Sequence, residues 1–473
     1  MQGNDYVRPG RLRTAEEFLE QWQQHGDDLG VAEVVRGGDG PLGSSAELFG
    51  KNLTNRFASH PMEGWDGSRD GRPTELTLRR WRRFGESGAA LLWGCEAFSV
   101  EPEGRANPNQ LCWGPEAAGS LERLRGALQE GSQSAGATLD ERAVGLQLTH
   151  SGRWSRPEGD AAPLVPASTE LDERVGEVQV LTDGELERIG EGFVASARCA
   201  WQAGFDFVDV KCCHGYLLNE LLGGRRSEGT YRGRTGAQLF VERVIEAIQG
   251  ECPGLGLGVR ISLGDSPPFA PGNRGVGVQS RLGEAQQGLG FDMIDADSDA
   301  WADPALSFLR YVQELGVQAV NISLGCPYTT PHLLRPAAYP PSDGYLPPED
   351  PLAGVARHLR AARLAREECP GLRVVGSGYS YLQEWLSAVA EYEIEQERVD
   401  FVGLGRMMLS YPEFPRDELE ARPLRRKLVC RTFSDCTTAP RHQMVSGCYP
   451  LDPFYKERPE AARVRELRQR GVA

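Results

Sequence analysis

Short apolar segments alternate with longer amphipathic segments along most of this chain, and this pattern constrains its fold more than any other feature. Such alternation is typical of parallel βαβ units. Eight strands are expected at 56–61, 90–96, 144–149, 205–210, 256–261, 319–323, 373–376 and 400–403. Amphipathic helices fit between them, for example at 183–203, 237–249, 304–315, 355–368 and 381–392. The pattern therefore predicts an α/β fold, a TIM (β/α)8 barrel.

The two ends of the chain are expected to lie outside the predicted barrel. Within the N-terminal part, the segment from Thr14 to Glu17 has the form of a capping box that opens a short helix. The connections 262–303 and 327–351 are long, and in a barrel they would roof the active face. We expect three regions: an N-terminal extension at 1–50, the barrel at 51–420, and a cysteine-containing C-terminal extension at 421–473.

Composition and the start of the chain exclude several classes of protein. The 473 residues are 40% hydrophobic, which suits a folded core, and the formal net charge of −15 is the opposite of a nucleic-acid binder's. No apolar run is long enough for a membrane span, and the start at Met1 lacks the features of a signal peptide. The 11 cysteines are dispersed, which predicts reduced thiols in a cytoplasm. We expect a small-molecule partner, with neither nucleic acid nor membrane.

The strand expected at 205–210 is followed by three side chains that carry chemistry. Lys211, His214 and Tyr216 come directly after the apolar run. Catalytic groups of parallel barrels lie at the C-terminal ends of the strands, so an amine, an imidazole and a phenol would converge there. A buried lysine beside an exposed loop histidine and tyrosine is the alternative that this segment alone leaves open.

Glycine-rich segments follow the last two expected strands. Glycine lets backbone N–H groups approach a phosphate, and an arginine beside them can pair with its oxygens. Many barrels bind phosphate at this position, so the two segments together predict a phosphorylated cofactor. The expected phosphate-binding residues are Gly376, Ser377, Gly378, Tyr379, Gly405 and Arg406.

The motif Lys211-x-x-His214-Gly-Tyr216-Leu217 resembles the substrate-binding segment of the Old Yellow Enzyme family of NADH:flavin oxidoreductases. The family usually has histidine where this chain has Lys211, and the resemblance covers about residues 50–460. It implies an FMN cofactor reduced by NADH or NADPH. It also implies that Lys211 and His214 bind the electron-withdrawing group of the substrate through their charge, and that Tyr216 donates a proton.

The same resemblance places the flavin ring against residues from four strands. It implies that Met62 and Glu63 lie at the reactive edge of the ring and that the Ala97 backbone meets its pyrimidine. The Gln147 amide suits the donors and acceptors of the pyrimidine, and Arg260 would stabilise the anion formed on reduction. Many family members have threonine or cysteine at the position of Glu63, where a carboxylate disfavours that anion unless it is paired, protonated or turned away. For Arg260, a buried salt bridge is the alternative.

The C-terminal cysteines resemble part of an iron–sulfur motif found in the 2,4-dienoyl-CoA-reductase-like branch of the family. Cys436 and Cys448 keep the last interval of that motif, but its first two positions fall on Val429 and Thr432, and Cys430 is displaced by one residue. Four thiolates normally hold such a cluster. We therefore expect no iron–sulfur cluster and no other metal, and we see no C-terminal nucleotide-binding domain like those of the longest members.

These observations predict an ene-reductase that transfers hydride from NADH or NADPH through FMN to an electron-poor alkene. Two alternatives stay open. A desolvated Lys211 could form the Schiff base of a lyase or aldolase, or the chain could be a catalytically retired flavin-binding barrel. Self-association into a homo-oligomer is also open, because family members range from monomers to tetramers.

Overall fold

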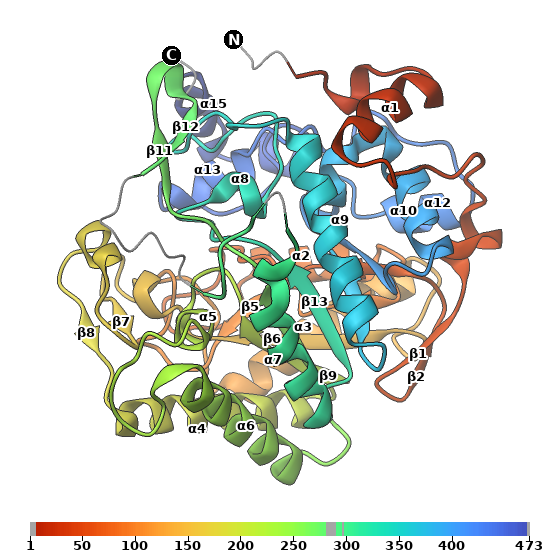
Figure 1. The fold of residues 1–473 in the computed structure, drawn as a ribbon. Coiled ribbons are helices and arrows are strands. Elements are labelled where there is room, and N and C mark those ends of the chain that lie inside the picture. Colours follow the sequence, from red (N-terminus) through yellow and green to blue (C-terminus); the bar gives the residue numbers. More distant parts are fainter. Residues whose placement is uncertain (1–5, 281–289, 296–297, 471–473) are drawn as a thin grey trace.

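Eight parallel strands close into a barrel in the computed structural model, which describes residues 6–280, 290–295 and 298–470 (Figure 1). Each strand pairs with the next in the order β3-β4-β6-β9-β10-β13-β14-β15, and β15 pairs with β3. The predicted TIM barrel is thereby confirmed. The strands are β3 (Phe57–Ser59), β4 (Leu91–Leu92), β6 (Ala143–Thr149), β9 (Phe207–Cys212), β10 (Gly256–Ser262), β13 (Ala319–Ser323), β14 (Arg373–Gly376) and β15 (Phe401–Leu404).

The strand predicted at 90–96 is wrong in its second half. Strand β4 stops at Leu92, and the chain returns as β5 (Ala97–Ser99), which pairs with the far end of β6. Gly94 lies between them with a φ of 89°, and a Cβ there would lie 2.7 Å from the backbone N of Gln147. The turn needs glycine because of this close approach.

Amphipathic helices surround the barrel and cover the outer faces of its strands (Figure 1). The helix predicted at 381–392 is divided: Gln383, with a φ of 56°, kinks the 3-10 helix η9 (Tyr379–Trp385), and α10 (Leu386–Glu395) begins only at Leu386. The outer helices are α2 (Glu75–Gly85), α3 (Ala117–Ser134), α4 (Asp183–Gln202), α5 (Leu217–Leu222), α6 (Gly233–Glu251), α7 (Asp303–Glu314), α9 (Pro351–Glu368), η9 and α10.

Aromatic rings fill the N-terminal end of the barrel. The hairpin of β1 (Ala46–Leu48) and β2 (Lys51–Leu53) carries Phe49, whose ring stacks on Phe207 with 4.1 Å between centroids. A Cβ on Gly256 would lie 2.3 Å from the Phe49 ring, and one on Gly145 would lie 2.2 Å from the Phe207 ring. Glycine in two strands therefore makes room for the rings that close this end.

The N-terminal segment begins with the predicted capping box. The Thr14 hydroxyl accepts a hydrogen bond from the Glu17 backbone and the Glu17 carboxylate accepts one from Thr14, at the start of α1 (Ala15–Trp22). Phe18 of this helix stacks on Trp385, with 4.9 Å between ring centroids. Residues 1–5, on which the expectation of no signal peptide partly rests, lie outside the described chain.

The C-terminal segment lies beside the long connections rather than on the outer face of the barrel (Figure 1). Of the two connections predicted to roof the active face, 262–303 contains residues outside the description, whereas 327–351 includes α8 (Pro331–Leu334). The domain limits at 50 and 420 stay a prediction. The helices that follow the last barrel strand are α11 (Arg406–Ser410) and α12 (Phe414–Leu419), and those of the C-terminal segment are α13 (Asp435–Arg441), α14 (Pro453–Lys456) and α15 (Glu460–Arg470).

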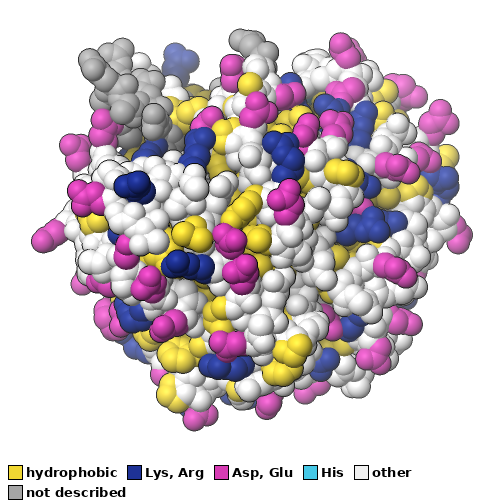
Figure 2. Space-filling view, turned by 60° about the horizontal axis from the view of Figure 1, so that its bottom comes forward, with side chains coloured by type: hydrophobic (Ala, Val, Ile, Leu, Met, Phe, Trp, Pro, Cys, Tyr) yellow, Lys and Arg dark blue, Asp and Glu magenta, His cyan; other side chains and the backbone are white. Residues whose placement is uncertain are grey.

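The surface mixes charges of both signs. Figure 2 shows acidic and basic side chains interspersed over one face, with hydrophobic side chains in small separate groups. No helix in the described ranges has the length and apolarity needed to cross a membrane. Small accessory elements complete the fold: β7 (Leu164–Val165) with β8 (Gln179–Val180), and β11 (Phe269–Pro271) with β12 (Gly277–Gln279).

Candidate active site

A cavity of about 260 Å³ lies at the C-terminal ends of the barrel strands. It brings together most of the residues predicted from the sequence. Two of them do not line it: Gly376 is the last residue of β14, and the Tyr379 side chain is buried in the core. The predicted residues that line the cavity are Met62, Glu63, Ala97, Gln147, Lys211, His214, Tyr216, Arg260, Ser377, Gly378, Gly405 and Arg406.

Lys211, Tyr216 and Glu63 form one interacting group. The Lys211 Nζ lies 3.7 Å from the centroid of the Tyr216 ring and 3.8 Å from the Glu63 Oε1. The Tyr216 hydroxyl donates a hydrogen bond of 3.0 Å to the same carboxylate oxygen. Burial lowers the pKa of Lys211, and the Glu63 carboxylate opposes this effect. Glu63 therefore does not turn away from the site: it is paired with a cation, as a carboxylate at this position requires.

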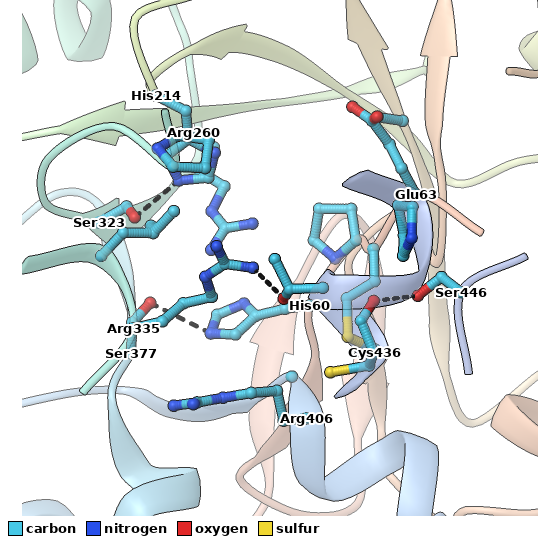
Figure 3. Close-up of a pocket in the computed structure, with 18 of the residues that line it drawn as sticks. His60, Glu63, His214, Arg260, Ser323, Arg335, Ser377, Arg406, Cys436 and Ser446 are labelled. Atoms are coloured by element: carbon cyan, nitrogen blue, oxygen red, sulfur yellow. Dashed lines mark hydrogen bonds between the residues drawn. The ribbon is translucent and has the colours of Figure 1, made fainter. Parts of the chain in front are cut away.

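His214 is held by two serines. Its backbone N–H donates to the Ser262 Oγ at 3.0 Å, and its Nε2 lies 2.8 Å from the Ser323 Oγ (Figure 3). Burial lowers the pKa of His214 well below its usual range, and the nearby Arg260 and Lys211 lower it further. The imidazole is therefore neutral near pH 7. The expectation that its charge would act on the substrate needs correction, because a neutral ring acts through a hydrogen bond.

Asp209 organises the floor of the cavity, although no sequence motif indicated a role for it. Its carboxylate accepts hydrogen bonds from Gln147 Nε2 at 2.6 Å, Trp93 Nε1 at 2.7 Å and the Arg260 backbone N–H at 2.7 Å. Gln147 and Asp209 lie opposite each other in the β6–β9 pairing, which explains why they meet. Burial raises the pKa of Asp209, while these donors oppose the rise. The available signal was an aspartate between two valines in an apolar strand.

The arginines and glycines fit the phosphate and ring of FMN. Arg260 forms no salt bridge in the described part of the chain and its Nε has no partner there, so the alternative of a structural ion pair does not hold. Arg406 donates from Nη2 to the Pro336 carbonyl at 2.7 Å, while its buried Nη1 is without a partner among the described residues. A Cβ on Gly405 would meet nothing closer than 3.7 Å. Unsatisfied cationic donors beside open backbone suit a phosphate.

His60 is a second site residue that no sequence motif indicated. Its Nδ1 lies 3.1 Å from the Asn321 Nδ2, and its Nε2 lies 3.1 Å from the Ser377 Oγ (Figure 3). A Cβ on Gly403 would lie 2.2 Å from the imidazole, so the glycine of β15 leaves space for this ring. Burial lowers the pKa of His60 well below its usual range. The ring therefore positions neighbours as a neutral group.

The roof of the cavity comes from two segments. The connection 327–351 supplies Pro327, Tyr328, Leu334 and Arg335, which confirms that this connection roofs the active face. The C-terminal segment also takes part, which the sequence did not indicate. It contributes Cys436, Thr437, Pro440, Arg441 and Ser446.

The three C-terminal cysteines lie near one another and near Arg406, with Cys430 and Cys448 buried and Cys436 partly buried. Burial raises the pKa of the Cys430, Cys436 and Cys448 thiols, and each of the latter two is also affected by Cys430. All three are free thiols. Within the described residues, no group of three or more His, Cys, Asp or Glu side chains has a metal-binding arrangement. The expected absence of an iron–sulfur cluster stays a prediction.

The barrel with this rim defines a flavin-dependent oxidoreductase of the TIM-barrel class. Residues 47–288 match the family described as NADH:flavin oxidoreductase / NADH oxidase, and the chain belongs to this family, which includes Old Yellow Enzyme. It is an FMN-dependent enzyme that uses NADH or NADPH as reductant.

A relative agrees with this membership, and solved structures share the fold. The chain is 27% identical over 378 residues to a NADPH dehydrogenase of Geobacillus thermodenitrificans, covering 77% of this chain and 90% of the relative. The fold is similar to that of an Old Yellow Enzyme homologue from Zymomonas mobilis, with a TM-score of 0.56 and 18% identity. The match covers 81% of this chain and 93% of the homologue. The fold is also similar to that of a 2-naphthoyl-CoA reductase complex, with a TM-score of 0.65 and 15% identity. That match covers 90% of this chain but 58% of the solved one.

Proposed function

We propose that this enzyme is an ene-reductase that reduces an electron-poor alkene, with Tyr216 as the proton donor. The observation that carries the proposal is the convergence of Lys211, His214 and Tyr216 at one edge of the cavity that also holds Arg260 and Arg406. An amine, an imidazole and a phenol beside a flavin site are the groups needed to bind an acceptor and protonate it. Family membership favours this function over the lyase and the retired barrel.

The flavin-binding roles rest on the groups that the barrel presents. Bound FMN would supply hydride chemistry between the nicotinamide and the acceptor. Arg406 and Gly405 would hold its phosphate, with Gly378 from the preceding strand. Gln147, fixed by Asp209, would bind the pyrimidine, and the Ala97 backbone, Met62 and Glu63 would border the ring. Arg260 would place its fixed positive charge where negative charge develops on reduction.

Lys211 and His214 would bind the electron-withdrawing oxygen of the acceptor. Negative charge develops on that oxygen as hydride reaches the alkene, so donors aimed at it are worth more in the transition state than in the ground state. Lys211 shares its charge with Glu63, whereas the His214 imidazole is neutral. The polarising group of this enzyme would therefore be one partly compensated ammonium and one neutral donor.

Tyr216 would give its proton to the carbon that does not receive hydride. Burial, the Glu63 carboxylate and Tyr328 together raise its pKa well above the usual range, so the hydroxyl keeps its proton through the neutral pH range. In the structure this proton points at Glu63. Rotation about the C–O bond would redirect it to a bound acceptor, while Lys211 continues to compensate the carboxylate.

Anaerobic half-reactions test the proposal. The flavin absorbance of purified holoenzyme is followed during reduction by NADPH or NADH, and again on addition of a cyclic enone, with the saturated ketone identified as the product. We expect loss and return of the oxidised spectrum. An enzyme that is reduced by a nicotinamide but returns its electrons to dioxygen and to no activated alkene would refute ene-reductase activity.

A further inference from the structure

Arg335 and two residues of α13 form one wall of the cavity, which we call the α13 wall: Arg335, Thr437 and Arg441. The Arg335 Nη1 donates to the Thr437 Oγ1 at 2.5 Å, and Arg441 lies one helical turn after Thr437 on the same face. Arg441 is anchored by the Asp343 carboxylate at 2.6 Å and by the Pro327 carbonyl at 2.5 Å. The C-terminal segment thus fixes two guanidinium groups at the cavity.

Arg335 is a cation of the cavity that lacks a close counter-ion among the described residues. It takes part in no salt bridge in the described part of the chain, and its buried Nη2 has no hydrogen-bond partner there. Burial lowers its pKa to about 10, and the neighbouring Arg441 and Arg406 contribute to this shift. The Arg335 side chain is only partly buried as a whole, but a buried cationic donor without a partner is costly, and an anion that enters the cavity would relieve this cost.

The other charges of the cavity have partners or assigned roles. The cavity lining includes one carboxylate, Glu63, and this carboxylate pairs with Lys211. Arg260 and Arg406 have the proposed flavin roles. Asp343 forms its salt bridge with Arg441 and acts on Arg335 only as a more distant negative charge, so Arg335 has no salt-bridge partner in the described part of the chain. Arg335 is therefore the cation left for a further ligand.

The α13 wall is continuous with the side of the cavity where the proton donor lies. The Arg441 guanidinium lies 5.9 Å from the centroid of the Tyr328 ring, and the Tyr328 hydroxyl lies 3.3 Å from that of Tyr216. Trp154 stacks on Tyr328 with 4.3 Å between centroids, which holds this link in place. A molecule whose alkene meets Tyr216 therefore extends along Tyr328 toward the arginines. Figure 3 shows Arg335 reaching into the cavity between His60 and His214.

We propose that the acceptor substrate is an anion, and that Arg335 binds its carboxylate or phosphate group while Arg441 adds a second positive charge. This inference rests on the proposed ene-reductase function. A guanidinium with a free edge matches the two oxygens of a carboxylate or phosphate. The phosphates of the nicotinamide reductant and of FMN offer the same chemistry, so the test separates the three sources.

The test compares acyclic enones that carry a terminal carboxylate with their methyl esters, over a series of chain lengths. For each enone and ester, the saturated analogue, which cannot be reduced, is bound to the FMN-loaded enzyme. Its affinity is measured from the change in flavin absorbance on binding, so turnover is not needed. We expect the enzyme to prefer the carboxylate at one chain length. Arg335→Met should reduce this preference by about 10- to 100-fold, the effect of losing a hydrogen bond to a charged group.

Arg198→Met is the matched control, because it removes an equally charged side chain that pairs with Glu251 on the outer surface. It should keep the preference of the parent enzyme. If Arg335→Met does not fold, Arg335→Lys is used. It keeps the charge but lacks the paired N–H donors of the guanidinium, so it should show an intermediate preference. Equal affinity for carboxylate and ester in the parent enzyme would overturn the inference without any variant.

Two further results would assign Arg335 to another anion and also overturn the inference. The first is that Arg335→Met slows only the reduction of the flavin by NADPH or NADH, which would place the nicotinamide phosphates at Arg335. The second is that Arg335→Met binds FMN in preference to riboflavin less strongly than the parent enzyme does, which would place the FMN phosphate at Arg335. If the carboxylate binds as expected but no enone is reduced, the anion site stands and the ene-reductase proposal fails.

Discussion

Replacing Tyr216 with phenylalanine is the most direct perturbation of the proposed chemistry. The change removes one hydroxyl from a buried ring and leaves the shape nearly unchanged, so the cavity and FMN affinity should be retained. The lost contacts are the 3.0 Å hydrogen bond to Glu63 and the 3.3 Å contact with Tyr328. Lys211 still compensates Glu63, so the cost in the free energy of unfolding should be about 1 kcal/mol.

The kinetic effect should be far larger and limited to one half-reaction. General-acid catalysis contributes about 10²- to 10⁴-fold, so the half-reaction with an enone should slow by this factor. The half-reaction with NADPH needs no proton from Tyr216 and should keep its rate. Stopped-flow absorbance under anaerobic conditions separates the two.

Tyr328→Phe is the matched control, since it removes the neighbouring hydroxyl and leaves the proposed donor in place. We expect a change of less than about tenfold, the effect of one lost hydrogen bond. If Tyr216→Phe reacts with every enone at the parent rate, or if both tyrosine variants lose the same amount, Tyr216 is not the specific proton donor.

Four further predictions address the cofactor site, its floor, stability and metal content. Arg406→Ala should weaken FMN binding by about 10- to 100-fold and leave riboflavin binding unchanged, because only FMN has the phosphate; equal fluorescence-titration constants for FMN in variant and parent would refute the assignment. Asp209→Asn should cost about 2–3 kcal/mol in denaturant unfolding and lower FMN affinity, since the amide cannot accept all the hydrogen bonds that Asp209 accepts. Burial lowers the pKa of His150 to about 3 and of His358 to about 4. Because the folded state then binds these protons less readily than the unfolded chain, their contribution to stability is present above about pH 6.5 and is lost as the pH falls toward about 4, at up to about 1.4 kcal/mol per pH unit for each histidine; His358→Gln should reduce this acid sensitivity in urea titrations, and an unchanged pH profile would contradict it. Protein purified without air should contain no stoichiometric iron or acid-labile sulfide, and finding both would restore the cluster that the cysteine spacing argues against.

The barrel could be predicted from the sequence because its strands are short apolar runs that alternate regularly with amphipathic helical segments. β13 and β14 have the predicted limits, while the others shift by a few residues. The break after Leu92 could not be predicted, because it depends on how closely Gly94 approaches Gln147, a contact between different strands. Local propensity carries no information about such contacts.

The site was predictable where a motif lies at the end of one strand. Lys211, His214 and Tyr216 fall within six consecutive residues, so their convergence follows from one strand and one turn. Asp209 and His60 were missed because their importance comes from partners on other strands. Arg335 and Arg441 were missed for a stronger reason: their positions depend on how the C-terminal segment folds over the barrel.

The α13 wall combines Arg335, from the connection 327–351, with Thr437 and Arg441 of the C-terminal segment. The barrel rim holds the groups proposed for hydride and proton transfer, whereas α13 lies more than 200 residues further along the chain than Tyr216. Substitutions, insertions or grafts in this late segment can reshape what the cavity admits without disturbing the strands or their hydrogen bonds. In this proposal the groups for hydride and proton transfer lie at the ends of the strands, whereas those for substrate choice lie in the connection 327–351 and in α13, so a new acceptor range would be engineered by exchanging these two roof segments.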